Sequence, residues 1–136
     1  MLRMRDLRVV DLMSIEPITV DASAPLSRAE RVMNRQEVSG LPVVDGSSRL
    51  VGVISQTDVL RDHADPMRSI QWTGLRVQDL MSSPALTIEA TAAVTEAATV
   101  MERFQVHRLV VVDTAGRPTG VLSTLDLVRG LVETEP

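Results

Sequence analysis

The chain has 136 residues, a formal net charge of −4 and no cysteine. This length suits one compact domain and is short for two independent ones. The lack of cysteine excludes disulfides, thiolate metal sites and a cysteine nucleophile, and the negative charge argues against a nucleic-acid polymer as partner, since such binding needs many cationic contacts to phosphates. Trp72 and Phe104 are the only Trp, Phe or Tyr residues, so the stacking platforms of single-strand binders are missing.

The sequence contains no apolar run of the about 18–20 residues that a membrane span needs. Its first residues, MLRMRDLRVVD, carry an acid where a signal peptide would continue apolar. We therefore expect a cytoplasmic protein with no membrane partner.

The second half of the chain repeats the first at a constant offset of 68 residues. LRVVDLMS at Leu7–Ser14 matches LRVQDLMS at Leu75–Ser82, and RLVGVISQTDVLR at Arg49–Arg61 matches RPTGVLSTLDLVR at Arg117–Arg129. Close to half of the positions from Leu7 to Arg61 are identical to their counterparts. Because one such unit cannot bury its apolar face alone, we expect the two copies to pair.

In the first copy, a short strand at Ile18–Asp21 leads to a helix, for which Ser23 is the expected N-cap. The apolar stripe of this helix consists of Leu26, Ala29 and Met33. A hairpin with the turn DGSSR and a final helix that begins near Thr57 follow. The two strands of the hairpin are expected at Leu41–Val44 and Leu50–Ile54.

The second copy predicts the same elements, from a strand at Leu86–Glu89 to a final helix that begins near Leu125. Thr91 is the expected N-cap of its first helix, and Pro118 is tolerable at the start of a strand. The helix stripe is expected to be Val94, Ala97, Met101 and Phe104, and the hairpin strands Leu109–Val112 and Thr119–Leu122. Each copy therefore has the order strand, helix, strand, strand, helix, which is an α+β fold.

We expect a single module over residues 1–136, made of a first repeat at 7–64, a connector at 65–74 and a second repeat at 75–132. Trp72 in the connector is interpreted as a packing anchor rather than a ligand contact.

These motifs resemble the CBS domain, the cystathionine-β-synthase-type repeat, and the tandem pair resembles a Bateman module. The matching pieces are DLMS followed by Pro17 or Pro84, then VSGLPVVD or VHRLVVVD, then GVIS or GVLS with an Asp three residues after the Ser. The resemblance covers nearly the whole chain. It implies a pseudo-two-fold pair of repeats with a cleft on either side of the seam, binding to adenosyl compounds (AMP, ADP, ATP, S-adenosylmethionine or NAD), homodimerisation and regulation of another protein.

The second copy resembles more narrowly the nucleotide-sensing γ subunit of AMP-activated protein kinase. This resemblance implies that His107 and Arg108 contact phosphate, and that Ser123 and Asp126 provide the hydroxyl and the ribose-binding carboxylate. Leu125 stands where that family often has a second hydroxyl. In the first copy, Ser39 and Gly40 replace the His-Arg pair, so that cleft lacks obvious cations of its own.

The Ser-x-x-Asp pattern at Ser55–Asp58 and Ser123–Asp126 has two interpretations. A carboxylate at the first turn of a helix can accept hydrogen bonds from a ribose diol, while the free N–H groups of that turn suit a phosphate. The same pattern before an apolar run is also typical of a capping box. Both interpretations can hold together, with the ligand received at the capped helix end.

The candidate ligand-binding residues form two sets. Four aliphatic side chains could enclose an adenine ring, although they could instead pack in the core, and ten further residues belong to the repeated motifs. The aliphatic set is Val20, Val38, Ile88 and Val106; the motif set is Ser39, Gly40, Pro42, Ser55, Thr57, Asp58, His107, Arg108, Ser123 and Asp126.

No catalytic or metal-binding residue is predicted. His63 and His107 are the only histidines, and no carboxylates cluster at metal-ligand spacing, so an enzyme is not expected. We expect a regulatory module that senses an adenine nucleotide, with Mg²⁺ as a candidate companion ion and no obligatory cofactor. The alternative is a ligand-free module for dimerisation or partner interaction. A further alternative, a Mg²⁺-responsive regulator, is supported only by the small acidic cluster Asp62–Asp65.

Overall fold

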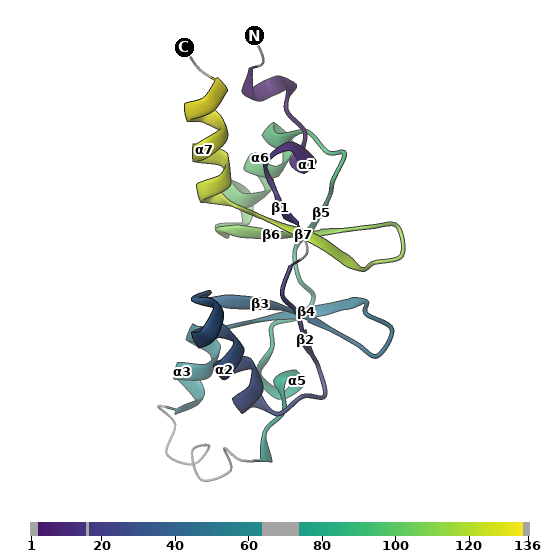
Figure 1. The fold of residues 1–136 in the computed structure, drawn as a ribbon, viewed down its shortest axis with the longest axis vertical. Coiled ribbons are helices and arrows are strands. Elements are labelled where there is room, and N and C mark those ends of the chain that lie inside the picture. Colours follow the sequence, from purple (N-terminus) through teal and green to yellow (C-terminus); the bar gives the residue numbers. More distant parts are fainter. Residues whose placement is uncertain (1–2, 16, 64–73, 135–136) are drawn as a thin grey trace. The chain divides into compact units, whose positions relative to one another are not determined.

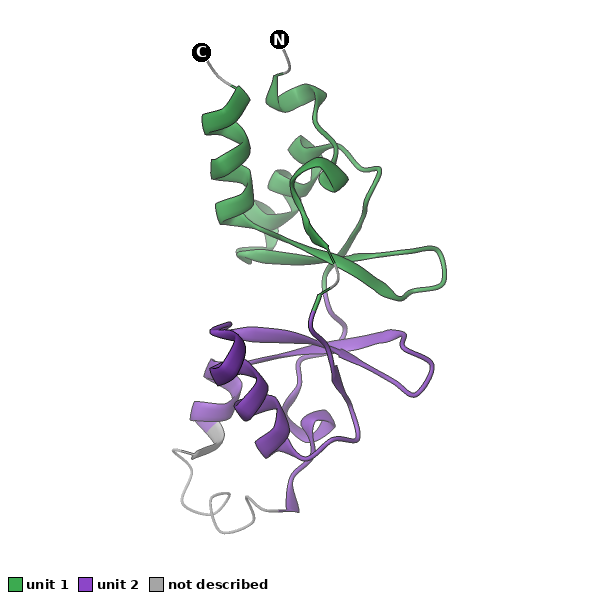
Figure 2. Ribbon diagram, viewed as in Figure 1, with its two compact units in different colours: residues 1–17, 86–136 green, residues 18–85 purple. Residues whose placement is uncertain are grey.

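The computed structural model of the chain describes residues 3–15, 17–63 and 74–134. The chain forms two compact units, one made of residues 18–85 and the other of residues 1–17 together with 86–136 (Figure 2). Trp72, the predicted connector up to residue 73 and the side chains of the acidic cluster Asp62–Asp65 lie outside the described part.

The unit of residues 18–85 is a three-stranded sheet whose helices α2 and α3 lie on the same side of it (Figure 1). The strand order is β2-β3-β4, with β2 parallel and β4 antiparallel to β3. The elements are β2 (Val20–Asp21), α2 (Leu26–Gln36), β3 (Gly40–Val44), β4 (Leu50–Ser55), α3 (Gln56–His63) and α5 (Val77–Leu80).

The unit that contains both ends of the chain has a four-stranded sheet in the order β1-β7-β6-β5. Its elements are η1 (Met4–Asp6), α1 (Val9–Leu12), β1 (Ser14–Ile15), β5 (Thr87–Glu89), α6 (Val94–Phe104), β6 (Arg108–Val112), β7 (Pro118–Ser123) and α7 (Thr124–Thr134). The predicted order strand, helix, strand, strand, helix is confirmed in both repeats. The short helices η1, α1 and α5 were not predicted.

The sequence repeats and the compact units do not coincide, because each repeat gives its leading segment to the other. Leu7–Ile15, from the first repeat, packs with residues 86–134 of the second, and Leu75–Ser82, from the second repeat, packs with residues 18–63 of the first. Two hydrogen bonds mark this exchange: the Leu26 N–H donates to the Leu75 carbonyl at 3.0 Å, and the Val94 N–H to the Leu7 carbonyl at 3.0 Å.

These two bonds also explain why the predicted N-caps are wrong. The N-cap of α2 is Pro25 and that of α6 is Ala93, and neither makes a side-chain cap bond. The leading segment supplies carbonyl oxygens to the first N–H groups of each helix, which a side chain would otherwise satisfy. Ser23 is not a helix cap: its N–H and its Oγ donate to Asp21 Oδ1, two residues earlier, at 2.9 and 2.7 Å. These bonds lower the pKa of the Asp21 carboxyl below its usual value.

The glycine of each GVIS or GVLS motif allows the leading segment to reach the sheet. A Cβ on Gly52 would lie 2.6 Å from the Ser82 carbonyl oxygen, and one on Gly120 would lie 2.7 Å from that of Ser14. Both distances are shorter than real Cβ contacts, so only glycine fits.

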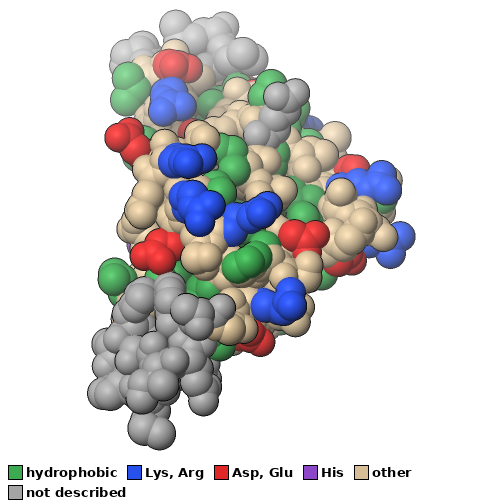
Figure 3. Space-filling view, turned by 60° about the horizontal axis from the view of Figure 1, so that its bottom comes forward, with side chains coloured by type: hydrophobic (Ala, Val, Ile, Leu, Met, Phe, Trp, Pro, Cys, Tyr) green, Lys and Arg blue, Asp and Glu red, His purple; other side chains and the backbone are tan. Residues whose placement is uncertain are grey.

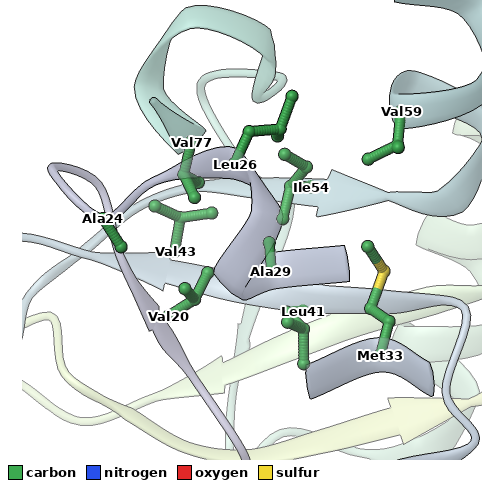
Figure 4. Packing of buried hydrophobic residues seen from close by; sticks show 10 residues of the cluster. All are labelled: Val20, Ala24, Leu26, Ala29, Met33, Leu41, Val43, Ile54, Val59 and Val77. Carbon is green, nitrogen blue, oxygen red and sulfur yellow. The ribbon is translucent and has the colours of Figure 1, made fainter. Parts of the chain in front are cut away.

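Each unit has its own hydrophobic core. The core of residues 18–85 (Figure 4) includes the predicted stripe Leu26, Ala29 and Met33, all at most 1% exposed. In α6 the prediction holds for Val94, Ala97 and Met101 but is wrong for Phe104, whose side chain is 55% exposed. Phe104 is the last residue of α6, and the chain reverses at Gln105 (φ 52°). Val106 then packs against the core in its place.

Candidate functional site

In the second repeat, four predicted residues meet where β7 passes into α7. Arg108 is paired with Ser123 across the sheet, and the Thr124 N–H donates to the His107 carbonyl at 2.9 Å. Asp126 lies in the first turn of α7. We call His107, Arg108, Ser123 and Asp126 the second junction.

The Ser-x-x-Asp pattern of this junction forms a capping box, which confirms that interpretation. The Ser123 N–H donates to Asp126 Oδ2 at 2.8 Å, and the Asp126 N–H donates to Ser123 Oγ at 3.1 Å. Asp126 is only 6% exposed. The box satisfies a free N–H of the helix end and holds the carboxylate in place.

The other oxygen of Asp126 is also engaged. Arg129 donates from Nη1 to Asp126 Oδ1 at 3.3 Å, from a side chain that is 58% exposed. A hydroxyl pair that approached this carboxylate would use its remaining lone pairs or displace the arginine. Arg129 is not among the predicted site residues, although an Asp and an Arg three residues apart on a helix are placed to interact.

The first repeat has the same backbone arrangement with different chemistry. Gly40 is paired with Ser55, and the Gln56 N–H donates to the Ser39 carbonyl at 2.9 Å. The Ser55 N–H and Oγ both donate to Asp58 Oδ2 at 3.0 Å, and the Asp58 N–H donates back to Ser55 Oγ at 3.2 Å. We call Ser39, Gly40, Ser55 and Asp58 the first junction.

The remaining motif residues of the first repeat lie near this junction. Thr57 is exposed in the first turn of α3, whereas Pro42 is buried inside β3 opposite Val53. In the second repeat Leu125 takes the place of Thr57 and is 65% exposed. A hydroxyl is nevertheless present one residue earlier, where Thr124 Oγ1 donates to the His107 carbonyl at 3.3 Å.

Charge separates the two junctions. His107 and Arg108 are both exposed at the start of β6, next to the positive end of α7. Ser39 and Gly40 occupy these positions at the start of β3 and carry no charge. The second junction therefore attracts an anion more strongly than the first.

The four aliphatic candidates belong to the hydrophobic cores. Val20 is 4% exposed on β2 and Ile88 is 8% exposed on β5, while Val38 and Val106 are half-buried against the same two clusters. Their core packing is thus confirmed, and contact with an adenine ring stays a prediction.

Within the residues the structure describes, no group of three or more His, Cys, Asp or Glu side chains could hold a metal ion. In the same part of the chain, no helix is long and apolar enough to cross a membrane.

Comparison with known proteins shows similarity along most of the chain. The CBS-pair protein CBSX2 from Arabidopsis thaliana, solved in complex with AMP, is 30% identical, with a TM-score of 0.82 and coverage of 93% of this chain and 96% of that one. The CBS domain of a bacterial CNNM/CorC family Mg²⁺ transporter, solved with ATP, has a TM-score of 0.82 over 97% of this chain and 92% of that one, but at 20% identity it shows the fold alone.

Among curated relatives, the inosine-5′-monophosphate dehydrogenase of Methanocaldococcus jannaschii is 30% identical over 112 residues, which are 82% of this chain and 21% of the enzyme. The chain thus spans about a fifth of the length of that relative. The family model of the CBS domain matches residues 9–65 and 77–133. The chain therefore belongs to the CBS domain family and carries two of these domains in tandem, as a Bateman module.

Proposed function

We propose that this chain is a regulatory module that binds an adenine nucleotide (AMP, ADP or ATP) or a related adenosyl compound, with the second junction as its main binding surface. The observation that carries the proposal is the meeting of two exposed cations, a helix N-terminus and a fixed carboxylate within one unit. The AMP complex of CBSX2, at 30% identity over 93% of this chain, supports the ligand class.

Different groups of the second junction bind different parts of the ligand. Arg108 can hold a phosphate through two parallel hydrogen bonds, and His107 adds another donor. The positive end of α7 favours the same negative charge. Asp126 accepts the ribose hydroxyls, either beside Arg129 or after that exposed side chain moves away. The first junction has a carboxylate and the N-terminus of α3 but lacks the two cations, so we expect the ligand at the second junction.

The wider role belongs to the same proposal. We expect Mg²⁺ to accompany a di- or triphosphate, the chain to act as a cytoplasmic homodimer, and the occupied module to regulate a partner protein. The proposal assigns no catalysis to the chain.

A second function, as a ligand-free dimerisation or partner-interaction module, is favoured by the exposed apolar face of α7. This face consists of Leu125, Val128, Leu131 and Val132, between 49% and 74% exposed. Large side chains that remain exposed together are typical of an interaction surface.

Thermal unfolding of the purified protein with AMP, ADP, ATP, S-adenosylmethionine or GMP, each with and without Mg²⁺, tests the proposal. A ligand at 100 times its dissociation constant stabilises the folded state by about 2.7 kcal/mol, which is an easily measured shift. We expect a rise in melting temperature for an adenosyl ligand and none for GMP. No rise for any of them at millimolar concentration would overturn ligand sensing and leave the interaction module.

A further inference from the structure

The solvent face of α2 carries three arginines in a row. Arg28, Arg31 and Arg35 are all exposed and follow one another at helix spacing of three and four residues. They lie on the side of the helix opposite its buried residues, and the row spans roughly 10 Å at the rise of an α-helix. We call these three residues the arginine stripe.

Local electrostatics disfavours this arrangement. Arg28 stands in the first turn of α2, where the helix dipole repels a cation, and this turn contains no acidic residue. Like charges three or four residues apart repel each other along a helix. Among the residues that the structure describes, no carboxylate forms an ion pair with any of the three. Arg28 and Arg31 therefore destabilise the first half of α2, whereas Arg35 lies in the last turn, where the helix dipole favours a cation.

The equivalent helix α6 shows that the fold does not need these charges. Glu96, Thr99 and Arg103 occupy the positions that match the three arginines, and Glu96 places an acid in the first turn, as the helix dipole prefers. Both helices bury apolar residues at the same three matching positions. The cost of Arg28 and Arg31, which the first repeat carries and the second avoids, points to a function outside the fold.

The guanidinium groups of the stripe suit a partner that carries carboxylates or phosphates. The chain contains no lysine, so all 14 of its Lys or Arg residues are arginines, whose planar groups bind either anion in pairs of hydrogen bonds. Basic side chains lie next to one another on the face drawn in Figure 3.

Two other anionic partners fit less well. A membrane-binding helix places large apolar side chains beside its cations, and none of the exposed large hydrophobic residues in the described part lies on α2. A nucleic acid would meet only three cations here, on a chain whose net charge is −4.

We infer that the arginine stripe of α2 docks an acidic segment of a partner protein, with carboxylates spaced to meet Arg28, Arg31 and Arg35. A helix with glutamates at i, i+3 and i+7 has the matching spacing. This inference goes beyond nucleotide sensing and does not depend on it: the stripe identifies a contact surface for a partner, whatever the junctions bind.

The test uses the double variant Arg28→Glu/Arg31→Thr, which takes the residues of α6 at the matching positions. The control is Arg5→Glu/Arg103→Thr, which makes the same change in net charge at exposed positions of the other unit. The probe is a fluorescent alanine-rich peptide with glutamates at i, i+3 and i+7, and a peptide of equal composition with its glutamates on all sides serves as comparison. Binding is followed by fluorescence polarisation at low and physiological salt.

We expect the spaced peptide to bind the wild type more tightly than the shuffled one, and the stripe variant to weaken this binding about tenfold, as the loss of several exposed ion pairs implies. The control variant should bind like the wild type, and the stripe variant should unfold at a higher temperature. The variant Arg35→Gln, which removes a charge without reversing it, should show a smaller loss. Equal binding by the wild type and both double variants would overturn the proposal, as would tighter stripe-dependent binding of a DNA oligonucleotide or of phosphatidylserine vesicles.

Discussion

The first and second junctions share a backbone and differ in charge. In both, a serine at the end of a strand and an aspartate in the next helix form a reciprocal capping box. The second junction adds His107 and Arg108, and its aspartate is more deeply buried and held by Arg129. The comparison teaches that the repeated motif is first a structural device, and that the charged residues which differ between the copies are the ones to test for ligand binding.

The largest effect should come from a feature that the two repeats share. Gly120→Ala places a methyl group 2.7 Å from the Ser14 carbonyl oxygen and 2.8 Å from the Met13 sulfur. Because backbone must move, we expect a loss of about 3 kcal/mol in the free energy of unfolding, measured by urea denaturation. Gly46→Ala is the matched control, since its Cβ would meet nothing within 4 Å. Equal stability of the two variants would show that the leading segment does not pack closely on β7.

Removing the aspartates separates capping from binding. Asp126→Ala and Asp58→Ala each abolish a capping box, so each should lose about 1 kcal/mol of stability. Only Asp126→Ala should also weaken the binding of adenosine and AMP, about tenfold, as the loss of a charged hydrogen bond implies. Calorimetric titration of both variants measures this difference. A similar loss of affinity in Asp58→Ala would place a ligand at the first junction as well.

Arg108→Ala should distinguish phosphate from nucleoside. The variant removes a guanidinium that adenosine does not need, so we expect AMP to bind up to about tenfold more weakly and adenosine to bind as before. The comparison of the two ligands by calorimetry is its own control. A parallel loss for both ligands would assign Arg108 a structural role in β6.

Arg129→Gln should have a smaller effect, in the opposite direction. Its ion pair with Asp126 is partly exposed and is worth at most about 1 kcal/mol. Freeing Asp126 Oδ1 from a competitor should therefore strengthen adenosine binding by no more than about fivefold. Weaker binding would show that Arg129 orients the carboxylate or contacts the ligand itself.

The smallest effect concerns Asp21, outside both junctions. Hydrogen bonds from Ser23 lower the pKa of this carboxyl in the folded state, so they stabilise the fold above the unfolded pKa, and this contribution disappears as the pH falls through the folded pKa. In Ser23→Ala the pKa of Asp21 should rise towards its usual value of 3.8, measured by NMR titration. Thr91→Ala, at the matching position of the second repeat, should leave the titration of Asp21 unchanged.

Much of the fold could be predicted from local patterns. The strands of both hairpins appear within one or two residues of their expected bounds, and α3 and α7 begin one residue before Thr57 and Leu125. Apolar periodicity and turn residues act over a few neighbouring positions, so the sequence shows them directly. The predicted burial of Phe104 is wrong because apolar periodicity does not show where a helix ends.

The candidate site was predictable in its residues but not in its contacts. The Ser-x-x-Asp pattern predicts a capping box from spacing alone, and the difference between His107–Arg108 and Ser39–Gly40 is visible in the repeat. The engagement of Asp126 Oδ1 by Arg129 depends on side-chain conformation, and whether the aliphatic candidates line a ligand or a core depends on burial. Neither follows from residue order.

The sequence by itself determined the repeat, the element order, the amphipathic faces of α2 and α6 and the capping boxes, because all of these arise between residues close along the chain. Only the tertiary structure decided that the leading segments are exchanged between repeats, that carbonyls of Leu75 and Leu7 replace the expected serine and threonine caps, and that Gly52 and Gly120 admit those segments. These features join residues far apart in sequence, where hydrogen bonding and close packing, rather than local propensity, select the partner.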